Sequence, residues 1–173
     1  MSITEPESPT STPVPTPTVS TATVLAVDVA NRFAHLYLDV ADLIGTHESG
    51  DHDASRGLEF FDLDGCRLAP AFDGNWTLVG LVKVNTAVPT NELQNRLVEV
   101  FAFLADYARN HQDELTDDYG ITLDEALATL PDLTGLTLVQ SIALLGGVTH
   151  AAPPAGTEAD PGSWFHNLMH KIS

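Results

Sequence analysis

Two short turns divide residues 58–84 into three strand-like runs, and this division constrains the fold more than any other feature of the sequence. The turns are Asp64-Gly65 and Asp73-Gly74-Asn75, and both are typical of tight hairpins. The runs that they separate are Leu58–Leu63, Cys66–Phe72 and Trp76–Val84. The pattern predicts a three-stranded antiparallel meander. The third run is apolar on both faces, which predicts a central or doubly covered strand.

Helical periodicity flanks these runs on both sides. Apolar residues between positions 24 and 44 recur every three or four residues, which predicts a helix that ends at Gly45. After the strands, the same spacing predicts a long helix beyond Pro89 and two short ones. The first short helix starts at a capping box of Thr122 and Glu125, and the second covers about 138–145. The predicted fold class is α+β, in the order α-β-β-β-α-α-α, with helices covering the sheet.

The ends of the chain differ from its middle in composition. Residues 1–22 are rich in Pro, Ser and Thr and have little apolar surface to bury, which predicts a disordered tail. Residues 149–162 have a similar composition and predict a flexible linker. Between them, residues 23–148 are expected to form a single α+β domain. Residues 163–173 are expected to form a short amphipathic helix.

The charge of the chain limits its partners. The 173 residues include 24 acidic and 7 basic side chains, and the formal net charge is −17. A field of that sign repels phosphate groups, so we expect binding neither to nucleic acid nor to a membrane surface. It favours a basic protein partner. The single cysteine, Cys66, cannot form an internal disulfide. The chain has no basic residue before Arg32, so its start does not have the pattern of a signal peptide. Both features indicate a cytoplasmic protein.

The stretch FFDLDGCRL, residues 60–68, resembles the first motif of the haloacid-dehalogenase-type phosphohydrolases, a hydrophobic strand followed by Asp-x-Asp-Gly-Thr. The resemblance implies that Asp62 attacks phosphorus, that Asp64 is the general acid and base, and that Mg²⁺ neutralises the charges. It does not extend beyond this stretch. Cys66 stands where the family usually has Thr, and the only lysines are Lys83, ahead of Thr86, and Lys171 in the tail. The competing interpretation of the same residues is a hairpin turn with no catalytic role.

Three further segments carry candidate binding residues. The loop HESGDHD, residues 47–53, offers His47, Asp51 and His52 as ligands for Zn²⁺ or Mn²⁺, or is simply a solvated polar loop. The stretch 106–132 contains eight acidic residues and only Arg109 as a basic one, which indicates a solvated face or a docking patch for a basic partner.

The last segment, PGSWFHNLMHKIS at 161–173, predicts a docking helix. Its apolar residues fall on one helical face and are of the types that anchor interfaces. They are Trp164, Phe165, Leu168, Met169 and Ile172. The sequence leaves open whether this helix docks on its own domain or on another protein.

These features favour a non-enzymatic, acidic adaptor or accessory protein that binds a protein partner through its terminal helix and requires no cofactor; a homodimer is a further option. Two alternatives stay open. One is a Mg²⁺-dependent phosphohydrolase that uses Asp62 and Asp64. The other is a small-ligand-binding α+β domain, whose pocket would lie between sheet and helices. The residues expected near that pocket are Tyr37, Phe60, Trp76 and Phe101.

Overall fold

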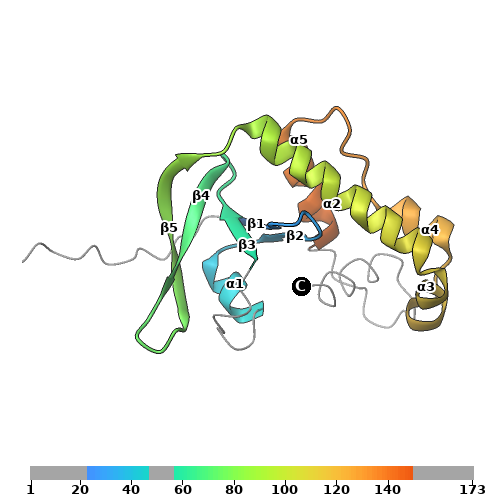
Figure 1. Ribbon diagram of the computed structural model, residues 1–173, viewed down its shortest axis with the longest axis horizontal. Coiled ribbons are helices and arrows are strands. Elements are labelled where there is room, and N and C mark those ends of the chain that lie inside the picture. The colour runs from blue at the N-terminus through green and yellow to red at the C-terminus, as the bar shows by residue number, and fades with distance from the viewer. Residues whose placement is uncertain (1–22, 47–56, 150–173) are drawn as a thin grey trace, which may run out of the picture.

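The computed structural model describes residues 23–46 and 57–149, which form a curved antiparallel sheet with helices against both faces (Figure 1). The strand order across the sheet is β2-β1-β3-β4-β5. The strands are Val24–Asp28 (β1), Ala34–Tyr37 (β2), Leu58–Phe61 (β3), Cys66–Phe72 (β4) and Leu78–Ala87 (β5). The helices are Val40–Thr46 (α1), Thr90–Asn110 (α2), Gln112–Tyr119 (α3), Leu123–Thr129 (α4) and Leu138–Thr149 (α5).

The predicted α+β class is confirmed, but the predicted order of elements and the three-stranded sheet are wrong. The sheet has five strands, because the helix expected over residues 24–44 is instead β1, β2 and the short helix α1. The cause lies in β1, which pairs with β2 on one side and β3 on the other. Val24–Val27 are fully buried, so the strand is apolar on both faces and lacks the alternation that identifies a strand in sequence.

The helices after the sheet also differ in part from the prediction. An unpredicted helix, α3, follows α2 and ends at Gly120, whose φ is 65°. The predicted capping box is present at the start of α4: the Glu125 carboxylate accepts the Thr122 amide at 2.8 Å, and the Thr122 hydroxyl accepts the Glu125 amide at 3.3 Å. Helix α5 continues beyond its predicted end, through Gly146, to Thr149.

Different helices cover the two faces of the sheet. Helices α2 and α5 lie against the face that carries Leu36 and Phe61: a Cβ added to Gly146 of α5 would lie 3.0 Å from Leu36 Cδ2, and Arg96 of α2 lies over the Phe61 ring. We call this the α2 face. Helix α1 contacts β2 and β5 on the other side, which we call the α1 face (Figure 1). At β1, which is buried on both faces, the hydrophobic core therefore lies on both sides of the sheet.

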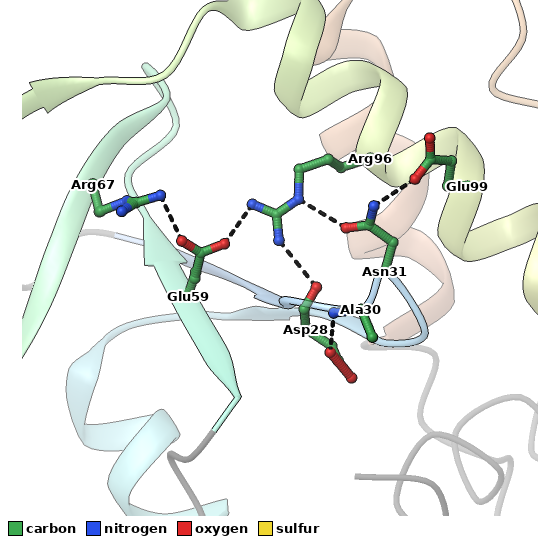
Figure 2. Close-up of polar contacts among 7 residues, drawn as sticks. All are labelled: Asp28, Ala30, Asn31, Glu59, Arg67, Arg96 and Glu99. Carbon is green, nitrogen blue, oxygen red and sulfur yellow. Dashed lines mark hydrogen bonds and ion pairs between the residues drawn. The ribbon is translucent and has the colours of Figure 1, made fainter.

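A polar network fixes α2 to the sheet (Figure 2). The Arg96 guanidinium donates to Glu59 on β3 at 2.7 Å, to the side chain of Asn31 at 2.8 Å and to the Asp28 carbonyl at 3.0 Å. The second carboxylate oxygen of Glu59 pairs with Arg67 on β4. One arginine thus connects α2, the β1–β2 turn and the middle of the sheet.

Three predicted segments lie outside the described residues: the tail 1–22, the terminal helix 163–173 and, apart from its first residue, the linker 149–162. Within the residues that the structure does describe, no helix combines the length and the apolar character needed to cross a membrane.

Candidate protein-interaction site

Residues 62–65, which carry the phosphohydrolase resemblance, form the hairpin turn between β3 and β4. The Asp62 amide donates to the Cys66 carbonyl at 2.9 Å, and the Gly65 amide donates to the Asp62 carbonyl at 3.0 Å. Gly65 has a φ of 80°, a conformation that glycine adopts without steric cost. The chain therefore doubles back here, as the hairpin interpretation of the sequence predicts, and does not continue into an open strand end.

Both carboxylate oxygens of Asp62 already have donors from the protein. One oxygen accepts the amides of Asp64, at 3.0 Å, and Cys66, at 2.8 Å; the other accepts Lys83 Nζ of β5, at 2.8 Å. Burial of the Asp62 carboxylate acts to raise its pKa, but these hydrogen bonds outweigh burial and the pKa lies below its usual value. A Mg²⁺ shared with Asp64 would have to displace these donors. In the described part of the chain, no three His, Cys, Asp or Glu side chains are placed to hold a metal ion.

Three turns of the sheet share one backbone pattern, and the third has an unusual residue at its key position. Each begins with an aspartate, and the residue three positions later has a positive φ. That residue is Asn31 at 54°, Gly65 at 80° and Trp76 at 63°. Asparagine and glycine adopt this conformation readily, whereas a bulky side chain there is strained. Trp76 is nevertheless 65% exposed at the tip of the β4–β5 hairpin, next to Phe72.

The hairpin that carries Trp76 extends beyond the rest of the sheet as a two-stranded arm (Figure 1). Strand β3 pairs with β4 only at Phe60–Leu68 and Phe61–Arg67, so the rest of β4 has β5 as its one neighbour. Pro70, which has no amide hydrogen to donate, lies in this part of β4, where a missing hydrogen bond is tolerated. We call residues 69–82 the arm.

One face of the arm is apolar and partly exposed. Cross-strand pairing puts Ala69 with Val82 and Ala71 with Gly80, on the same side of the sheet as Arg67 and Phe61. These pairs lie on the α2 face, but α2 and α5 cover the other strands of the sheet and not the arm. Gly80 is buried and Ala69 and Ala71 are half-buried, but no atom of the described residues lies within 4 Å of a Cβ added to Gly80, and Val82 is 48% exposed. We define the arm face as these two pairs with Val84; Trp76 lies at the tip of the hairpin, with its ring next to Phe72.

The opposite side of the arm is covered. Leu78 and Leu81 are buried on the α1 face, and α1 contacts β5 there. The prediction that the third strand is central or doubly covered is therefore wrong, because β5 is an edge strand that is covered on one face only. Its pairing with β4 shifts register twice, and such irregular edges are poor templates for another strand. The arm face, and not the strand edge, is therefore the candidate surface.

The charged groups near the arm are mostly acidic. The basic residues at its base are already engaged: Arg67 pairs with Glu59, and Lys83 pairs with Asp62. The exposed carboxylates Asp64 and Asp73 lie in the turns at the two ends of β4. An apolar surface bordered by carboxylates is complementary to a segment that carries both apolar and basic side chains.

The other predicted site residues are not brought to one place. Phe101 lines a groove on α2, Trp76 lies at the arm tip, and Tyr37 and Phe60 are buried in the sheet, so these four do not form the predicted ligand pocket. His35, in the segment that was predicted to be helical, is buried in β2 next to the ring of Tyr37, at a centroid distance of 4.3 Å.

Two groups of predicted site residues lie outside the described residues. They are the metal candidates His47, Asp51 and His52, and the docking residues Trp164, Phe165, Leu168, Met169 and Ile172. The arm face itself was not predicted. The signal in the sequence was the proline in the second strand-like run, which indicates a stretch of strand without a second neighbour.

Comparison of the chain with protein families, with curated proteins and with solved structures gives no match in any of the three.

Proposed function

We propose that this protein is a non-enzymatic adaptor that binds an amphipathic, basic segment of a partner protein on its arm face. The observation that carries the proposal is the partly exposed apolar face of the β4–β5 arm, where Val82 is 48% and Val84 37% exposed. Monomeric proteins seldom leave contiguous apolar surface exposed unless it serves an interaction. The strained Trp76 supports the same conclusion, because unfavourable backbone geometry is often retained where a side chain has a function.

The chemistry of the surface specifies the partner. The small side chains of Ala69 and Ala71 leave room for large side chains to approach, Val82 and Val84 offer apolar contacts on the face, and Trp76 offers one at the tip. Asp64 and Asp73, in the turns at the two ends of β4, favour Lys or Arg in the partner, in keeping with the net charge of −17. An amphipathic helix with leucine on one side and lysine on the other has this combination.

The binding test uses Trp76 as the reporter. The chain has two tryptophans, so the full-length Trp164→Phe variant leaves Trp76 as the only one. Titration with a synthetic amphipathic helix of leucine and lysine should shift its fluorescence to the blue and saturate. A helix with the same pattern of leucine and glutamate should produce no shift.

Matched variants locate the binding surface. Val82→Glu puts a charge on the arm face, whereas Val139→Glu makes the same change at a 71% exposed site on α5. We expect Val82→Glu to weaken binding about tenfold, because losing part of one valine's burial costs about 1.4 kcal/mol. Val139→Glu should have no effect. Equal binding by the two variants would show that the peptide recognises only net charge, and the proposal would fail.

A further inference from the structure

A second apolar surface lies on α2, away from the arm. It is a groove of about 360 Å³ between α2 and the chain that runs from α4 to α5. Val98, Phe101 and Ala105 line it from α2, and Leu127, Leu130 and Leu133 line it from the other side. α4 and α3 lie at the end of α2 remote from the hairpin of β4 and β5 (Figure 1). The groove is therefore separate from the proposed partner site.

We propose that this groove seats residues 163–173 of the same chain. If this segment is helical, Phe165, Leu168 and Ile172 recur on one face over about 10 Å. Along α2, the groove extends from Val98 to Arg109, which is about 16 Å of helix. The apolar stripe of the segment is thus no longer than the groove, and its spacing is that of a helix that binds in a groove.

The charges of residues 163–173 and of the groove rim are also complementary. Residues 161–173 contain Lys171 and two histidines but no Asp or Glu. At the rim of the groove, Asp132 accepts the Thr134 amide, and the hydrogen bonds from Thr134 hold the pKa of Asp132 below its usual value, so it stays ionised. The one basic residue of the rim, Arg109, is already paired with Asp106 at 2.7 Å. A basic segment therefore meets a net acidic rim.

The chain between α5 and residues 163–173 is long enough to reach the groove. Residues 150–162, between the end of α5 and the segment, can extend over about 45 Å. Helix α2 has 21 residues and is about 30 Å long, so every point along it is within reach. A connection of this length gives an effective concentration of roughly millimolar, so even an affinity near 100 μM would keep the segment mostly seated.

A spin label placed at the end of the chain tests the proposal in the full-length protein. Cys66→Ser removes the native thiol, and Ser173→Cys provides a site for a nitroxide. Paramagnetic broadening of amide resonances should then concentrate on residues 98–109 and 127–134 and leave residues 69–82 sharp. Ile172→Glu, which puts a charge on the apolar stripe, should abolish the broadening. Broadening spread evenly over the domain, or concentrated on the arm, would overturn the proposal.

Two controls separate the remaining outcomes. Ala105→Glu blocks the groove, whereas Ala143→Glu makes the same change on the exposed side of α5; only the first should remove the local broadening. Mixing unlabelled, isotope-enriched chain with spin-labelled, unenriched chain should give no broadening. Broadening in the mixture would mean that the segment binds a second copy of the chain, and the intramolecular assignment would be wrong.

Discussion

Replacing Arg96 by alanine should lower the stability of the domain more than replacing any other single charged residue that reaches the surface. The substitution removes the contacts with Glu59, Asn31 and the Asp28 carbonyl at once, and the Arg96 side chain is only 14% exposed. Truncating one partner of a buried ion pair costs about 3–5 kcal/mol. Glu59 is 23% exposed and keeps its second arginine, so we expect a loss of about 2–3 kcal/mol in the free energy of unfolding.

Arg67 provides a matched control, because it pairs with the other oxygen of the same carboxylate. Its side chain is 45% exposed and makes no other contact in the network of Figure 2. Arg67→Ala should therefore cost less than about 1 kcal/mol, as exposed ion pairs do. Arg96→Lys should recover only part of the loss, because an ammonium group cannot reach three acceptors in the planar geometry of a guanidinium.

Urea unfolding followed by circular dichroism measures all three variants. Domains of this kind are stable by about 5–15 kcal/mol, so a loss of 2–3 kcal/mol shifts the midpoint clearly. Equal losses for Arg96→Ala and Arg67→Ala would refute the reasoning, since they would show that Glu59 alone determines the effect and that the contacts to the β1–β2 turn contribute nothing.

Three further predictions concern the sheet and its turns. Gly65→Ala should destabilise the domain by about 1–2 kcal/mol in the same urea assay, because its φ is 80°. Gly80→Ala, whose new Cβ would meet no atom of the described residues within 4 Å, should cost nothing. Gly146→Ala should cost about 1–3 kcal/mol through its 3.0 Å approach to Leu36, and Gly147→Ala, in open space on the same helix, should not. Asp62→Asn should remove stability that is present above the unfolded-state pKa, about 3.9, and lost as the pH falls through the lower folded-state pKa; the difference from wild type in thermal unfolding should therefore shrink below about pH 4.

The parts of the fold that depend on local chemistry could be predicted from the sequence. The turns at Asp64-Gly65 and Asp73-Gly74-Asn75 and the Thr122–Glu125 capping box all depend on residues within a few positions of one another. Strands β1 and β2 could not be predicted, because β1 is buried on both faces by segments distant in sequence. Its apolar residues therefore also fit the spacing of a helix.

The candidate site could not be predicted from the sequence for a related reason. The run that became β5 is apolar on both faces, and such a run in sequence indicates a strand covered on both sides. Whether α2 covers Val82 depends on where the helix crosses the sheet, and that crossing is set by Arg96 and Glu59, which are 37 positions apart. Sequence patterns of short period contain no information on such a contact.

The length of α2 has a consequence for the two proposed binding sites. A helix of 21 residues, about 30 Å long, separates the sheet end of the domain from the end that carries α3 and α4. This is several times the electrostatic screening length at physiological salt, about 8 Å. Charge added at one end is therefore not sensed directly at the other. Two ligands could therefore occupy the molecule together without touching, and α2, which Arg96 anchors to the sheet, connects the two sites.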